Sequence, residues 1–224
     1  MSAALSTIYC ISGMGADERI FNNLELPHFN LQHIPWIVPK KVESLQEYAK
    51  RMSEPIAEQL PIILGVSFGG IIAIEIAKQI KAKKIIIISS VKKKNELPVW
   101  MQIAGRWKLD SVFPVKPFRL INPILNKRLG VSNEEEKKLV NAYRKSTDPV
   151  YLNWAVHQVL SWKNETYPEN LVHIHGDKDN IFPVKNIAAN HVIKGGTHMM
   201  IYNLAKEIAD YIEKIIQSPM HPHN

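Results

Sequence analysis

Two runs of aliphatic residues constrain the fold of this 224-residue chain more than any other feature. Residues 61–66 (PIILGV) and 84–91 (KIIIISSV) are short and rich in isoleucine, which is typical of strands buried on both faces. Between them, residues 71–80 are apolar on most sides and have the length of a buried helix. A strand, a helix and a second strand in this order predict a βαβ unit with parallel strands.

The alternation of strand-like and helical segments extends over most of the chain. Strands are expected at residues 7–12, 30–37, 61–66, 84–91, 171–175 and 189–193, and helices at residues 16–24, 71–80 and 199–216, with two more beginning after Ser44 and Asp148. We therefore expect a three-layer α/β fold, in which a mostly parallel sheet of about six strands carries helices on both faces.

The alternation stops between residues 92 and 148, where no strand-like run occurs. A structureless loop of that length is uncommon inside a compact domain, so we expect a lid of short helices. The chain is then a single domain with its core at residues 1–91 and 149–218, the lid at about 92–148, and a loose tail at 219–224. Apolar lid residues are interpreted either as the lining of an acyl or aromatic pocket or as the lid's own core: Trp100, Trp107, Phe113, Phe118 and Leu120.

Composition narrows the cellular context. The chain is 46% hydrophobic and 22% charged, as expected for a globular protein, and it has no uncharged apolar run long enough to span a membrane. Its first residues lack the pattern of a secretory signal. A single cysteine, Cys10, cannot form an internal disulfide, and we interpret it as a small core residue. These features favour a cytoplasmic protein.

The formal net charge of +7 comes partly from two lysine clusters, at residues 81–84 and 92–94. We interpret them as solvated ends of secondary structure, and because no interleaved aromatic motif accompanies them, we expect no nucleic-acid partner. Lysines near the lid weakly favour an anionic leaving group such as a coenzyme A thioester, although a simple carboxylic ester is the preferred substrate.

Ser67 is the strongest candidate for a reactive group. It lies in Gly65-Val66-Ser67-Phe68-Gly69, followed by Gly70, where a predicted strand passes into a predicted helix. A sharp turn of this kind exposes the serine hydroxyl to a base, and flanking glycines relieve its steric clashes. The helix that follows directs the Phe68 amide and the positive end of its dipole toward a developing oxyanion.

A base and an acid are expected late in the chain. His198 ends Gly195-Gly196-Thr197-His198, a glycine-bearing loop that lies before the last helix, at the edge of the sheet where sites of open α/β folds form. Asp177 and Asp179 both follow the strand at 171–175. Spacing does not separate them, but we favour Asp179 as the acid and Asp177 as a turn-forming residue.

Three segments together resemble the α/β-hydrolase superfamily: GVSFGG at 65–70, HGDKDNIFP at 175–183 and GGTHMM at 195–200. Within it the chain is most similar to small single-domain esterases and carboxylesterase-like bacterial hydrolases with a helical lid, over nearly its whole length. The resemblance implies a cofactor-free serine hydrolase that cleaves an ester or thioester through an acyl-enzyme. It places the acid on Asp179 and the oxyanion hole on the amides of Met14 and Phe68.

The chain departs from the family pattern in places. Ser12-Gly13 stands where relatives often have His-Gly, and Val66 stands where they often have histidine before the nucleophile. Neither change removes a triad member or a backbone donor. The antiparallel strands that open many relatives are expected to be missing.

Other interpretations remain weaker. Gly13-Met14-Gly15 begins a dinucleotide-binding pattern, but Glu18 occupies its third glycine position and no acidic residue ends the second strand. His173 and His175 share a strand face and His221 and His223 lie in the tail, yet their spacing does not establish a metal site. We interpret the first pair as strand-end packing and the second pair as part of a disordered tail. The remaining alternatives are a non-hydrolytic ligand-binding protein, an acyltransferase or a lyase on the same fold.

Overall fold

A single parallel sheet organises the computed structural model, which describes residues 5–107 and 122–217. Its strands are β1 (Ser6–Ile11), β2 (Phe29–His33), β3 (Ile62–Val66), β4 (Lys84–Ile88), β5 (Leu171–Gly176) and β6 (His191–Ile193). They are arranged in the order β2-β1-β3-β4-β5-β6, and every neighbouring pair is parallel. This confirms the expected sheet of about six strands, and no antiparallel strand occurs among the described residues.

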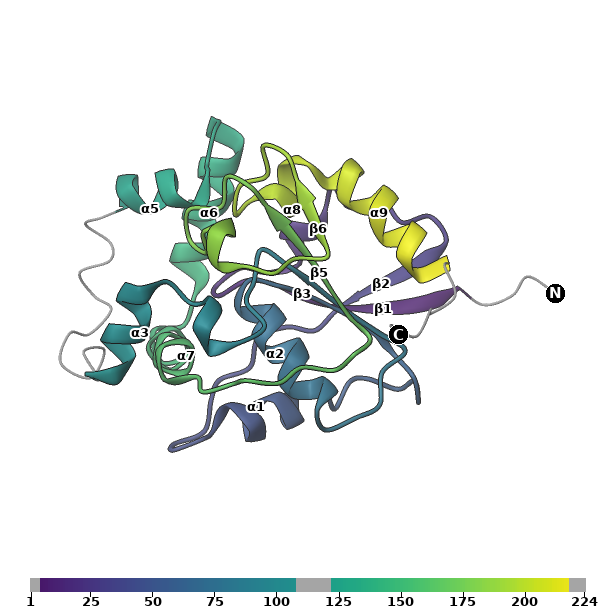
Figure 1. Ribbon diagram of the computed structural model, residues 1–224, viewed down its shortest axis with the longest axis horizontal. Helices are drawn as coiled ribbons and strands as arrows, with labels where there is room; N and C mark the ends of the chain where they lie inside the picture. The colour runs from purple at the N-terminus through teal and green to yellow at the C-terminus, as the bar shows by residue number, and fades with distance from the viewer. Residues whose placement is uncertain (1–4, 108–121, 218–224) are drawn as a thin grey trace.

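Helices cover both faces of this sheet (Figure 1). The helices are α1 (Leu45–Met52), α2 (Phe68–Ala77), α3 (Val99–Arg106), α5 (Asn122–Leu129), α6 (Glu134–Ser146), α7 (Pro149–Ser161), α8 (Met200–Asn203) and α9 (Ala205–Gln217), and the short 3-10 turns are η1 (Glu18–Phe21), η2 (Lys94–Glu96) and η4 (Val184–Asn186). Helices α1, α2 and α7 contribute to one buried cluster, and α6, α8 and α9 contribute to the other. The expected three-layer arrangement is therefore confirmed.

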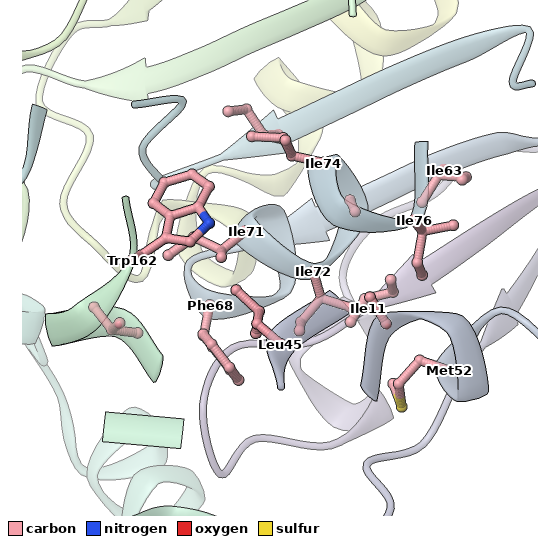
Figure 2. Packing of buried hydrophobic residues seen from close by; sticks show 14 of the residues in the cluster. Ile11, Leu45, Met52, Ile63, Phe68, Ile71, Ile72, Ile74, Ile76 and Trp162 are labelled. Carbon is pink, nitrogen blue, oxygen red and sulfur yellow. The ribbon is translucent and has the colours of Figure 1, made fainter. Parts of the chain in front are cut away.

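Helix α2 is the most deeply buried helix beside the sheet. Ile71, Ile72 and Ile74 have no exposed surface, because α1 and the sheet enclose the helix. Figure 2 shows Phe68, Leu45 and Ile72 gathered where α2 meets α1. Burial of an aliphatic side chain stabilises the fold by about 1.5–3 kcal/mol, so α2 is held firmly against β3, the strand that precedes it.

Two helix starts follow the predicted capping chemistry. Ser44 Oγ accepts a hydrogen bond from the Glu47 amide at 3.2 Å, and Glu47 Oε2 accepts one from the Ser44 amide at 2.9 Å, which forms a capping box before α1. Asp148 Oδ1 accepts hydrogen bonds from the amides of Val150 and Tyr151 before α7. Both expected helices are confirmed.

Two predicted helices are wrong in extent. Residues 16–24 form only η1, because Asp17 caps a single 3-10 turn through the Arg19 amide and the chain leaves it directly after Phe21. The last helix is interrupted at Leu204, whose backbone is not helical. Helix α8 packs on η1, whereas the apolar stripe of α9 packs on the sheet. A straight helix would not make both contacts.

Helices α3, α5 and α6 lie between β4 and α7 in the chain, within the segment expected to be helical. Trp100 and Trp107 are 53% and 71% exposed, so their interpretation as buried lid core is wrong. Phe113, Phe118 and Leu120, like the tail at 219–224, lie outside the described residues. Within the described ranges, no helix has the length and apolar character needed to cross a membrane.

Candidate active site

The carboxyl ends of the central strands align at one edge of the sheet. Ile11 of β1 pairs with Gly65 of β3, which pairs with Ile87 of β4, which in turn pairs with His173 of β5. The segments that follow these strands therefore emerge side by side, where open α/β sheets build their sites. All the residues proposed from the sequence belong to these segments or to the loop after β6.

Ser67 occupies the turn between β3 and α2 with a strained backbone. Its φ of 53° and ψ of −118° lie outside the regions that side-chain-bearing residues prefer. The turn persists because its surroundings hold it from both sides. The Ser67 amide donates to Ile88 O at 2.9 Å, and the Ser67 carbonyl accepts from Ser90 Oγ at 2.6 Å. Strain of this kind gathers at functional sites, where the structure over-determines it.

Glycines at 65 and 69 allow this turn for steric reasons. A Cβ atom on Gly65 would overlap the backbone carbonyl of Gly69. A Cβ atom on Gly69 would overlap the carbonyl oxygens of Ile11 and Ser12, at the end of β1. Any side chain at either position would push α2 away from the sheet and displace Ser67.

His198 and Asp179 form a continuous hydrogen-bonded row with Ser67. His198 Nε2 lies 2.9 Å from Ser67 Oγ, and His198 Nδ1 lies 2.8 Å from Asp179 Oδ2. The carboxylate requires the hydrogen on Nδ1, so Nε2 of the neutral ring is the acceptor for the serine hydroxyl. Ser67 is half-buried, whereas His198 and Asp179 are buried. The structure thus brings together the three residues singled out from the sequence.

The Asp179 carboxylate is held in its ionised form. Burial raises its pKa, but the neighbouring His198, His175 and backbone amides outweigh burial, so the pKa lies below its usual value. Its Oδ1 accepts hydrogen bonds from the amides of Ile181 at 2.8 Å and Phe182 at 2.9 Å. One oxygen is thereby fixed by the backbone, which leaves Oδ2 directed at His198.

Asp177, the other acidic candidate, has a different position. Its Oδ1 accepts a hydrogen bond from the Gly195 amide at 2.7 Å, and its own amide donates to Ile193 O. It therefore joins the loop after β5 to the loop that carries His198. Asp177 makes no hydrogen bond to the His198 imidazole in the described structure. We expected it to bond backbone within its own turn, whereas its carboxylate binds the amide of Gly195, 18 residues later.

The segment after β1 lies against Ser67. A Cβ atom on Gly13 would lie 3.5 Å from Ser67 Cβ, so Met14 follows directly after a point of contact with the serine. Phe68 is the first residue of α2, and a first-turn amide has no acceptor within its own helix. Both amides proposed as oxyanion donors therefore belong to segments that border the serine.

Trp36 is a site residue that the sequence reasoning missed. Its Nε1 donates to Gly13 O at 3.1 Å, and its ring stacks on Phe68 with centroids 5.4 Å apart. It thus braces both segments that border Ser67. Ser90 was missed as well, because it was placed inside the strand predicted at residues 84–91, whereas β4 ends at Ile88 and Ser90 lies after it.

Other reactive residues lie away from this row. Cys10 is buried in β1, and burial raises the pKa of its thiol to about 12, so a nucleophilic thiolate does not form there at neutral pH. In residues 5–107 and 122–217, no three His, Cys, Asp or Glu side chains converge as metal ligands. His221 and His223 lie outside the described residues.

Comparison with known proteins gives matches in structure but not in sequence. No protein-family model and no curated protein matches the chain. The structure is similar to an epoxide hydrolase from Bacillus megaterium solved with an inhibitor, with a TM-score of 0.73, 12% identity, and coverage of 96% of this chain and 95% of that one.

Two further solved structures give the same result. MenH from S. aureus has a TM-score of 0.72 and 16% identity, and the match covers 96% of this chain and 95% of that one. A malate-bound thermophilic esterase from Thermogutta terrifontis has a TM-score of 0.70 and 14% identity, with coverage of 95% and 91%. At these identities the likeness concerns the fold, and it spans nearly the whole chain.

Proposed function

From the α/β-hydrolase fold of this chain, we propose that the protein is a serine hydrolase that cleaves a carboxylic ester or thioester of a small molecule. The observation that carries the proposal is the row from Ser67 through His198 to Asp179, with contacts of 2.9 and 2.8 Å. A serine hydroxyl is a weak nucleophile until a base is within hydrogen-bonding reach, and here the base is in turn oriented by a carboxylate.

In the first half of the reaction, Ser67 Oγ attacks the acyl carbonyl carbon while His198 Nε2 takes the hydroxyl proton. The imidazolium that forms is stabilised by the ionised Asp179, which remains unprotonated. Collapse of the tetrahedral intermediate breaks the bond to the leaving group, and His198 returns the proton to the departing oxygen or sulfur. The acyl group is then bound to Ser67.

The oxyanion of the tetrahedral intermediate is proposed to be held by the amides of Met14 and Phe68. Support comes from the close approach of Gly13 to Ser67 and from the place of Phe68 at the start of α2. The positive end of the α2 dipole adds favourable charge at the same place. Removal of one such donor in other serine hydrolases slows turnover by about 10²–10³-fold.

In the second half, His198 takes a proton from water, and the hydroxide attacks the acyl carbonyl. The carboxylic acid leaves, and the serine regains its proton. The nucleophile, base, acid and donors of this scheme all come from the chain, so the proposal requires no cofactor.

We also propose that about 92–148 forms a lid over the core at 1–91 and 149–218, because helices α3, α5 and α6 interrupt the strand sequence there. Such a segment would select the acyl group. A cytoplasmic location is part of the same proposal, supported by the single, buried and unpaired Cys10.

The test is labelling with a fluorophosphonate probe, followed by a substrate panel. The wild-type protein should be labelled, and Ser67→Ala should not. Absence of labelling in folded wild-type protein, under conditions that label a known esterase, would contradict the proposal. p-Nitrophenyl esters of graded chain length, with thioesters and lactones beside them, would then identify the substrate class.

A further inference from the structure

Strand β5 carries two buried histidines that the proposed reaction does not use. His173 and His175 project from the same face of the strand, and neither has exposed surface. His173 Nε2 lies 3.2 Å from His175 Nδ1, and His175 Nε2 lies 2.8 Å from the carbonyl oxygen of Phe182. Buried polar groups of this kind require an explanation, because an unsatisfied one costs about 1–3 kcal/mol.

The hydrogen bonds fix the tautomer of both rings. A carbonyl oxygen only accepts, so His175 Nε2 carries the hydrogen in its bond to Phe182 O. Burial lowers the pKa of His175 and of His173, which keeps both rings neutral. His175 Nδ1 is then an acceptor, and His173 Nε2 donates to it. The remaining nitrogen, His173 Nδ1, is then an acceptor, and it has no hydrogen-bond donor among the described residues.

This chain of hydrogen bonds ends at the acid of the proposed triad. His175 Nε2 lies 3.7 Å from Asp179 Oδ2, the same oxygen that faces His198 Nδ1. The carbonyl that His175 holds belongs to Phe182, whose amide binds Asp179 Oδ1. His175 therefore contacts the turn that orients the carboxylate and lies beside its catalytic oxygen.

The charged groups around His173 and His175 have hydrogen-bond partners of their own. Lys92 and Glu96 face it from the segment after β4, and Asp179 and His198 face it from the loops after β5 and β6. The Lys92 ammonium donates to Ala188 O and lies 4.8 Å from the centre of the Tyr167 ring. The Glu96 carboxylate accepts the amides of Lys92 and Ala188.

We propose that His175, locked in one tautomer by His173, is a positioning residue for Asp179. It holds the turn at residues 179–182 so that Asp179 Oδ2 meets His198 Nδ1. The inference rests on the proposed function, since it assigns His175 a role through the acid of that mechanism.

The test compares His175→Leu, which cannot donate, with His175→Gln, whose amide can donate to Phe182 O. We expect His175→Leu to lower kcat by about tenfold, a part of the 10²–10⁴-fold that general acid–base catalysis contributes, with KM nearly unchanged. The acid limb of the kcat/KM profile should move to lower pH, because a displaced carboxylate stabilises the imidazolium less. His175→Gln should retain most of kcat.

His173→Leu is the second variant, since it removes only the hydrogen bond that fixes the His175 tautomer and lies two residues further from Asp179 along the chain. It should lower kcat less than His175→Leu and move the acid limb in the same direction. His191→Leu is the matched control, because His191 lies on the adjacent strand β6 and stacks on Tyr211 away from the triad. Its kcat and profile should equal those of the wild type.

A readout independent of turnover separates this inference from the proposed function. A hydrogen held between His198 Nδ1 and Asp179 Oδ2 should give a far-downfield ¹H signal in the wild type. The signal should weaken or disappear in His175→Leu and persist in His191→Leu. Folded His175→Leu protein that keeps this signal, the wild-type kcat and the wild-type acid limb would overturn the inference, and so would a shift of the limb to higher pH. Wild-type protein that shows the signal but is not labelled by fluorophosphonate would instead contradict the proposed function.

Discussion

His198 Nε2 lies 2.9 Å from Ser67 Oγ, although 131 residues separate the two in the chain. The contact depends on the strand order, which places β3 and the loops after β5 and β6 at the same edge of one sheet. Local sequence accounts for each residue's surroundings, but only the sheet brings the two side chains within reach of each other.

Ser67→Ala should abolish most turnover and leave the fold intact. Loss of the nucleophile leaves only binding and oxyanion stabilisation, so kcat should fall by a factor on the order of 10⁴ or more. Steady-state kinetics on the best ester substrate, with circular dichroism as the check on folding, measure the effect. Turnover near that of the wild type would remove Ser67 from the mechanism.

Ser67→Gly should be more stable than Ser67→Ala. The φ of 53° at this position disfavours any residue with a Cβ atom, and glycine adopts it freely. Such strain costs about 1–3 kcal/mol. The gain in the glycine variant is smaller than this, because glycine also raises the conformational entropy of the unfolded chain. Urea unfolding of the two variants, both without the hydroxyl, isolates the backbone contribution. Equal or lower stability of the glycine variant would mean that the turn is not strained.

Asp179→Asn and Asp177→Asn should differ strongly in activity. An amide nitrogen at 179 facing His198 Nδ1 would favour the wrong imidazole tautomer, so kcat should fall by about 10³–10⁴-fold. Asparagine at 177 still accepts from the Gly195 amide, so its kcat should stay within about twofold of the wild type. The two variants have the same change of charge and therefore control for each other. The reverse order of effects would exchange the roles of the two residues.

Stability should fall as the pH drops below about 6.5, because of the buried pair on β5. Burial lowers the pKa of His173 well below 6.5 and also lowers that of His175. Below pH 6.5 the unfolded chain takes up protons that the folded chain excludes, so acid favours unfolding. Each histidine contributes up to about 1.4 kcal/mol per pH unit until its folded-state pKa is reached.

Urea unfolding at pH 7.5 and 5.5 measures this dependence. His173→Leu should lose less stability than the wild type between the two pH values, since one buried titrating group is removed. His191→Leu should have a slope closer to that of the wild type, because His191 is only half-buried. A slope in His173→Leu as steep as in the wild type would show that the ring is protonated in the folded state.

Local signals in the sequence predicted those parts of the fold that depend on local chemistry. Isoleucine-rich runs predicted β3 and β4, and the capping residues Ser44 and Asp148 predicted the starts of α1 and α7. The helix expected at 16–24 failed because its apolar spacing also suits a single 3-10 turn, and only packing against α8 distinguishes the two.

The candidate site was predictable where one motif fixes one residue. Glycine contexts identified Ser67 and His198, and a family pattern separated Asp179 from Asp177. The supporting residues were not predictable in this way. His175 was interpreted as strand-end packing because a histidine on a strand does not reveal that its Nε2 will lie 3.7 Å from a carboxylate four residues later. Trp36 carries no motif at all, and its role depends on a contact with Gly13 across the edge of the sheet.

The positions of Ser67 and His198 in the chain also determine when the proposed triad can form during synthesis. Ser67 leaves the ribosome 131 residues before His198, which at about 5–20 residues per second is a delay of about 7 to 26 s. Through that interval the nascent chain carries a hydroxyl without a base, because β5 and β6 have not yet joined the edge of the sheet. The contact between Ser67 and His198 therefore forms only after residue 198 has been made, and under the proposed function a product that terminates before that residue would lack the base.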